Sequence, residues 1–134
     1  MSKILGSCLC GKVRFESSNN FENFHLCHCT QCQKATGSAF ASNLFTSPEN
    51  INWVNGLEFI KRYDVPNRSI SKAFCTECGS GVPYLSGSGQ SMVVPAGCLD
   101  NEPVLEPQDN IFCSEQVKWY KKGVSAKRFE TFPE

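Results

Sequence analysis

The sequence lacks an excess of charge of either sign, because thirteen Lys and Arg balance thirteen Asp and Glu. This balance excludes a nucleic-acid binder driven by phosphate neutralisation and an acidic, self-repelling disordered chain. No apolar run approaches the roughly 20 residues that are needed to span a bilayer. Residues 1–7 also lack the apolar stretch of a signal peptide, so we expect a cytoplasmic protein with no membrane contact.

Convincing helical periodicity is scarce as well, and one short helix is predicted at residues 30–36. Short stretches bounded by Gly, Pro and Asn instead predict strands at residues 12–16, 37–45, 57–65, 69–75, 82–85 and 91–94. Asn55-Gly56 lies between two apolar runs and predicts a type I′ hairpin. With 134 residues and a hydrophobic fraction of 40%, the sequence predicts one mostly-β domain of several short antiparallel strands, spanning residues 1–134.

Cysteine, in contrast, is abundant, with nine residues in the chain. In a reducing cytosol disulfides do not persist, and an odd number of cysteines would leave one unpaired in a pure disulfide framework. Cysteines of intracellular proteins are usually buried small hydrophobes, metal ligands or reactive thiols. The spacing of these nine therefore decides between the three roles.

Two close pairs, Cys8/Cys10 and Cys75/Cys78, predict a structural zinc site. Zinc in structural sites takes four ligands in a tetrahedron, with Zn–S distances of about 2.3 Å. A C-x-x-C pair can supply two sulfurs from a tight turn, and a C-x-C pair can supply two from one face of an extended stretch. Together the pairs would close the site and join segments some 65 residues apart. The alternative is four unrelated buried thiols.

Cys27, Cys29 and Cys32 form a different cluster, with three sulfurs within six residues. Three protein ligands and one open position are typical of a catalytic zinc. A histidine could close this site: His25 shares strand parity with Cys27 and Cys29, whereas His28 points the other way in an extended segment. Both histidines could equally be surface residues or lie just outside the ligand shell. A metal-free, redox-active cluster is the other alternative.

Three further residues have less specific patterns. Cys98 and Cys113 have no near partner and are predicted to be small buried hydrophobes. Lys34 is the cation nearest to the three-cysteine cluster in sequence. It is either a solvated surface residue or a contact for a substrate carboxylate.

Three segments of the sequence, GSCLCGKVRF (6–15), CHCTQCQKATGSAF (27–40) and FCTECGS (74–80), carry a family resemblance. Together they resemble the glutathione-dependent formaldehyde-activating enzyme (GFA) family, which also includes centromere protein V. AGCLD (96–100) and KWY (118–120) resemble the closing segments of the family. The resemblance covers residues 6–120, which gives the expected core of the domain.

This resemblance implies an Mss4-like, or β-tent, zinc-binding fold. It also implies two Zn²⁺ per chain, with a structural zinc on Cys8, Cys10, Cys75 and Cys78 and a catalytic zinc on Cys27, Cys29 and Cys32. The activity of the family is the addition of formaldehyde to glutathione, which is formally a carbon–sulfur lyase reaction run in reverse. We therefore expect a lyase-like enzyme acting on an aldehyde and on glutathione or another small thiol as co-substrate.

Two other functions remain open at this stage. The chain could be a non-catalytic zinc module for protein or nucleic-acid interaction, since basic and aromatic residues are interleaved in residues 118–129. The zero net charge makes nucleic acid the less favoured partner. Alternatively, the middle cysteines could form a redox sensor. The oligomeric state and the true substrate do not follow from the sequence.

Overall fold

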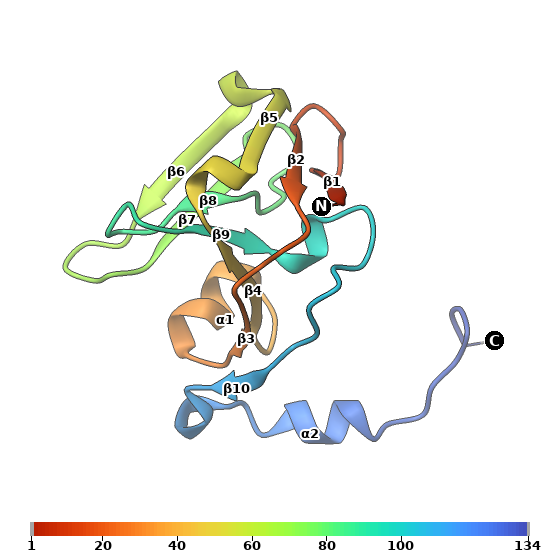
Figure 1. Cartoon of the computed structure of the whole chain (residues 1–134). Coiled ribbons are helices and arrows are strands. Elements are labelled where there is room, and N and C mark those ends of the chain that lie inside the picture. The colour runs from red at the N-terminus through yellow and green to blue at the C-terminus, as the bar shows by residue number, and fades with distance from the viewer. Residues whose placement is uncertain (1, 134) are drawn as a thin grey trace.

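The computed structural model describes residues 2–133, in which ten short strands form three small sheets (Figure 1). The first sheet has the order β1 (Lys3–Ser7), β2 (Arg14–Ser18), β5 (Ile51–Asn55). The second has the order β10 (Asp109–Ile111), β3 (Asn23–Cys27), β4 (Ala41–Thr46), β9 (Met92–Pro95), β8 (Tyr84–Leu85). The third pairs β6 (Ile60–Asp64) with β7 (Ser71–Cys75). All neighbours are antiparallel except β10 and β3, which run parallel.

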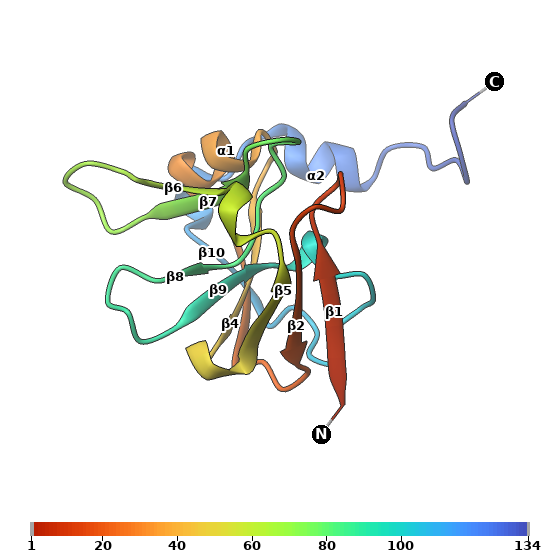
Figure 2. The ribbon, with the colours of Figure 1, turned by 90° about the horizontal axis from the view of Figure 1, so that it is seen from above.

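Helices are few and short. The α-helices are α1 (Thr30–Thr36) and α2 (Trp119–Val124), and four 3₁₀ turns cover Pro48–Asn50, Leu57–Phe59, Ala96–Cys98 and Cys113–Glu115. Figure 2, a view turned by 90°, shows α2 lying beside the domain and the chain after it running away from the sheets. None of the helices in residues 2–133 has the length and apolar character that a membrane span requires. The mostly-β class predicted from the sequence is confirmed.

The helix predicted at residues 30–36 is observed with the same bounds, and both of its ends are capped. Cys29 precedes it in an extended conformation, and its sulfur accepts a hydrogen bond from the Cys32 N–H at 3.3 Å. Gly37 ends it with a left-handed φ of 66°, as is common at helix C-termini. Two candidate metal ligands are thereby built into the start of this helix.

The type I′ hairpin predicted at Asn55-Gly56 is wrong. The strand before it, β5, pairs with β2, whereas the strand after it, β6, pairs with β7, so this turn links two different sheets. Gly56 has a left-handed φ of 94° and packs against the backbone of Lys12. The dipeptide therefore marks a left-handed turn, as its composition indicates, but the pairing of the flanking strands is decided by distant partners.

We expect Gly56→Ala to lower the free energy of unfolding by at least about 2 kcal/mol, since a side chain at this φ is strained. The new Cβ would also lie 2.1 Å from the Lys12 carbonyl oxygen. Urea denaturation measures the change. Gly123→Ala is the control, because a Cβ at that position in α2 meets no atom within 4 Å. Equal stability of Gly56→Ala and the wild type would contradict the tight packing of this turn.

The buried side chains form three clusters that hold the sheets together. The largest includes Phe15, Phe24, Leu44 and Val94, together with Cys98, which belongs to neither group of candidate metal ligands. The other two each contain cysteines: one surrounds Cys8 and Cys75 with Val13, Ala73 and Val82, and the other joins Cys27 and Cys32 to Ala41. Each group of candidate metal ligands thus has two members in the hydrophobic interior that the strands create, while its other members reach toward the surface.

Candidate functional site

The structure brings Cys8, Cys10, Cys75 and Cys78 together, with all four sulfurs within 4.8 Å of one another. The Cys8 and Cys10 sulfurs are 3.5 Å apart, and those of Cys10 and Cys75 are 3.8 Å apart. A tetrahedron with Zn–S bonds of about 2.3 Å has sulfurs about 3.8 Å apart. The spacing of these sulfurs therefore fits a four-thiolate zinc site.

Two tight turns give this cluster its shape. Gly11 has a φ of 81° and donates its N–H to the Cys8 carbonyl at 3.1 Å, while Gly79 has a φ of 78° and donates to the Cys75 carbonyl at 2.7 Å. Both conformations favour glycine, because a Cβ is strained at positive φ. The Val13 N–H lies 3.3 Å from the Cys8 sulfur, a contact that stabilises a thiolate.

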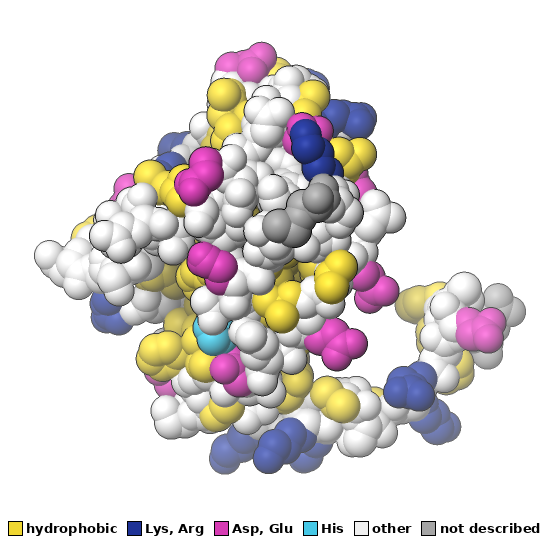
Figure 3. Space-filling view, viewed as in Figure 1, with side chains coloured by type: hydrophobic (Ala, Val, Ile, Leu, Met, Phe, Trp, Pro, Cys, Tyr) yellow, Lys and Arg dark blue, Asp and Glu magenta, His cyan; other side chains and the backbone are white. Residues whose placement is uncertain are grey.

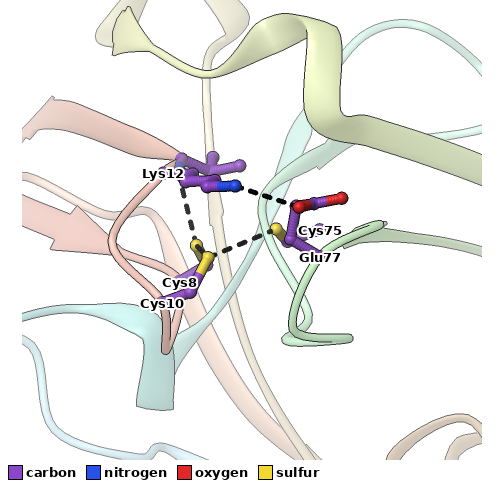
Figure 4. A network of polar contacts seen from close by, with 6 residues as sticks. Cys8, Cys10, Lys12, Cys75 and Glu77 are labelled. Carbon is purple, nitrogen blue, oxygen red and sulfur yellow. Dashed lines mark hydrogen bonds and ion pairs between the residues drawn. The ribbon is translucent and has the colours of Figure 1, made fainter.

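Polar neighbours support the outer side of the cluster (Figure 4). The Ser80 hydroxyl lies 3.3 Å from the Cys78 sulfur and lowers the pKa of that thiol to about 5. Lys12 and Glu77 form an ion pair of 2.9 Å between the two cysteine loops. This pair is exposed and adds little stability by itself, but it leaves the four sulfurs facing one another beneath it.

Cys27, Cys29 and Cys32 form the second group, and their three sulfurs also lie within 4.8 Å of one another. Cys27 is the last residue of β3, Cys29 caps α1 and Cys32 lies in its first turn. Burial raises the pKa of the Cys27 and Cys32 thiols, so these sulfurs ionise readily only beside a cation. Three soft donors that need a cation fit a thiolate-bound metal. No fourth His, Cys, Asp or Glu joins this group within residues 2–133.

Neither histidine closes the three-cysteine group, and both lie outside it, which is the alternative that the sequence left open. His25 as a fourth ligand is wrong: its Nδ1 contacts a carboxylate oxygen of Asp109 at 2.5 Å, and it lies outside the group of donor atoms. Residues two apart in a strand share a face, but their Cα atoms are about 6.6 Å apart. Because the His25 ring turns toward Asp109, it does not reach the sulfurs of Cys27 and Cys29. His28 as a surface residue is also wrong, because its side chain is fully buried.

β10 and the segment that follows it contact the residues at the start of α1. The Asn110 amide oxygen accepts a hydrogen bond from His28 Nε2 at 2.8 Å, and the Tyr120 ring packs against the His28 ring. Glu115 accepts hydrogen bonds from the Thr30 N–H at 2.9 Å and from its hydroxyl at 3.1 Å. Sequence reasoning missed these supports, since partners more than 80 residues apart leave no local pattern.

The predictions for the three remaining residues, Cys98, Cys113 and Lys34, differ in how they compare with the structure. Cys98 is buried as predicted, and burial raises the pKa of its thiol to about 12. Cys113 as a buried hydrophobe is wrong, because it lies exposed in the 3₁₀ turn after β10. Lys34 is exposed on α1 and does not line the cavity described below, so the structure places it as a surface residue.

A cavity of about 790 Å³ lies between the two cysteine groups, and its wall includes Cys8 from one and Cys32 from the other. This volume is within the usual range for small-molecule sites. Lys72 and Asp100 are the charged side chains that line it in the described chain. Lys72 donates to the Ala35 carbonyl of α1, and Asp100 accepts from the Ser7 hydroxyl at 2.8 Å. No pattern in the sequence singles out Lys72 or Asp100.

The fold and the site define a small mostly-β domain with two groups of cysteines that could each hold a metal ion. The model of the glutathione-dependent formaldehyde-activating enzyme family matches residues 3–115, and the chain belongs to this family.

Known proteins agree with this assignment. A Halomonas elongata protein, provisionally named a glutathione-dependent formaldehyde-activating enzyme, is 29% identical over 110 residues, which cover 77% of this chain and 69% of the relative. A crystal structure of a Rhodobacter sphaeroides protein, determined as a structural genomics target, has a TM-score of 0.63 and 23% identity. It covers 80% of this chain and 99% of its own, and it supports the fold alone.

Proposed function

We propose that the chain is a zinc-dependent, carbon–sulfur lyase-like enzyme that joins an aldehyde to glutathione or another small thiol. Formaldehyde and glutathione are the substrates that the family description suggests. The observation that carries the proposal is the three-cysteine group, whose Cys32 lines a cavity of substrate size. The four-cysteine group is assigned a structural zinc and the three-cysteine group a catalytic one, giving two per chain.

A zinc held by three thiolates has a fourth position that can lower the pKa of an incoming thiol or polarise a carbonyl. In the reaction a sulfur–carbon bond forms, the carbonyl π electrons move to oxygen, and the proton of the thiol ends on that oxygen. The reaction would take place beside Cys32, because Cys32 is the member of its group that lines the cavity. Tyr84 lines the same wall, and burial raises its pKa to about 12, so its hydroxyl remains a proton donor at neutral pH.

The two charged residues of the cavity suit a thiol peptide. Lys72 can pair with a carboxylate and Asp100 with an ammonium group, and glutathione carries both kinds of group. Lys72 is held by the carbonyl of Ala35 in α1, the helix that also carries Cys32. Binding through Lys72 would therefore place the substrate beside the helix that presents the reactive site.

Lys72→Met is expected to raise the KM for glutathione about tenfold with little change in kcat, because it removes one charge contact and keeps the apolar stem. Steady-state kinetics measures both constants. The control is Lys34→Met, which removes an exposed cation of α1 outside the cavity. An unchanged KM, or a loss confined to kcat, would contradict the binding role of Lys72.

Metal counting by native mass spectrometry, with and without glutathione, tests the site assignment. Two zincs per chain are expected. The activity is tested by the rate at which formaldehyde and glutathione equilibrate in the presence of the protein. If the protein neither changes this rate nor binds glutathione at millimolar concentration, the proposed reaction is wrong for this chain, even if both zincs are present.

A further inference from the structure

Charge is distributed unevenly along the second half of the chain, although the total over the whole chain balances. Residues 73–117 contain six Asp and Glu and no Lys or Arg, and five of the six acidic residues lie in residues 100–115, the acidic stretch. Residues 118–128 contain five Lys and Arg and no acidic residue. We call residues 118–133 the basic tail. An acidic stretch is thus followed directly by a basic tail.

Within residues 2–133 the charges of these two segments are largely unpaired. None of the five cations of the basic tail forms an ion pair with a described residue, and neither Glu102 nor Glu106 does. Figures 1 and 2 show the tail leaving the sheets and projecting outward, and Figure 3 shows Lys and Arg side chains along it. Every residue from 121 to 133 is exposed.

Both segments also expose large apolar side chains. Val104 and Phe112 are 76% and 57% exposed in the acidic stretch. The basic tail exposes Trp119, Val124, Phe129 and Phe132, the last of them at 85%. Aromatic and apolar side chains rimmed by charge are the usual composition of a protein–protein interface. The family match ends at residue 115, so the basic tail lies beyond the matched region.

We propose that the basic tail of one copy docks on the acidic stretch of a second copy, and the reverse, in a twofold dimer. A twofold interface uses the same surface on both partners, which requires a self-complementary surface. This chain carries both complementary halves side by side in its sequence. Stable interfaces use roughly 20–30 residues a side, a number close to that of residues 100–133. Tyr120 of α2 packs against His28, but the part of the tail after α2 points away from the sheets of its own chain, which favours a second copy as the partner of that part.

Sedimentation velocity on the full chain over a concentration series tests the dimer. A dimer is expected at low salt, with a dissociation constant that rises as salt is added. Lys127→Glu/Arg128→Glu, or Glu102→Lys/Glu106→Lys, should each weaken it at least tenfold. In a one-to-one mixture of these two double variants, the mixed dimer keeps one unaltered contact between a basic tail and an acidic stretch. The mixed dimer should therefore be tighter than the dimer of either variant alone.

The matched control is Lys61→Glu/Arg68→Glu, which reverses two exposed charges elsewhere and should leave the dimer intact. A wild-type chain that sediments as a monomer at 100 µM protein and low salt would overturn the proposal. So would a mixture of the two weakened variants that stays as monomeric as each alone. Binding of the tail to single-stranded DNA by an otherwise monomeric chain would overturn it in favour of a nucleic-acid partner.

Discussion

Cys75→Ser is expected to unfold the domain under conditions in which the wild type is folded. Cys75 is fully buried in β7, and its sulfur belongs to the four-cysteine group. Structural zinc sites contribute apparent binding free energies of about 10–16 kcal/mol, and domains are stable by only about 5–15 kcal/mol. Loss of one ligand therefore removes a large part of what keeps this fold together. Circular dichroism with a temperature ramp, alongside zinc analysis, measures the result.

Cys113→Ser is the control for this experiment, because Cys113 is exposed and belongs to neither group of sulfurs. It should melt like the wild type and keep its zinc. A chelator should unfold the wild type, and added zinc should refold it. If Cys75→Ser loses metal but melts at the wild-type temperature, the four-cysteine group is not a structural site.

Cys32→Ser is expected to abolish activity while leaving the fold in place. Loss of a residue that merely orients a metal ligand costs 10–100-fold, so loss of a ligand that faces the cavity should cost at least about 100-fold. Zinc content should fall from two per chain to one. The rate of glutathione–formaldehyde equilibration, measured by NMR, and metal analysis give the two numbers.

Here, too, Cys113→Ser should retain both the rate and the metal, since its thiol is remote from the cavity wall. Full activity of Cys32→Ser would contradict a catalytic role for the three-cysteine group. Unfolding of Cys32→Ser would instead make this group a second structural site. A variant that keeps two zincs but loses the rate would point to chemistry at the Cys32 sulfur itself.

The features of this molecule that could be predicted from its sequence depend on residues that lie close together along the chain. A helix over residues 30–36 needs only local capping, and a C-x-C or C-x-x-C pair can supply two sulfurs to one metal from a single short segment. The pairing of Cys8/Cys10 with Cys75/Cys78 could be predicted because only four sulfurs close a structural site. Each of these expectations depended on chemistry that a few neighbouring residues contain.

Long-range contacts explain what the sequence did not predict. The His28 ring is buried against Asn110 and Tyr120, which are more than 80 residues away, so the local sequence could not predict its burial. Glycine at position 56 indicates a left-handed turn, but which strands pair across it depends on β2 and β7. Cys113 lies exposed in the 3₁₀ turn after β10, and no local pattern indicates that β10 pairs in parallel with β3 just before this turn.

Cys8 and Cys32 line the same cavity, which has a consequence for inhibition by heavy-metal ions. A soft ion such as cadmium or mercury that follows the substrate into the cavity reaches sulfurs of both groups. On the proposed function, loss of the zinc at Cys32 would stop turnover. Loss of the zinc at Cys8 would remove the cross-link between the N-terminal loop and β7. If the proposed zinc sites are correct, heavy-metal ions would unfold the domain as well as inhibit it, and recovery would require added zinc as well as removal of the ion.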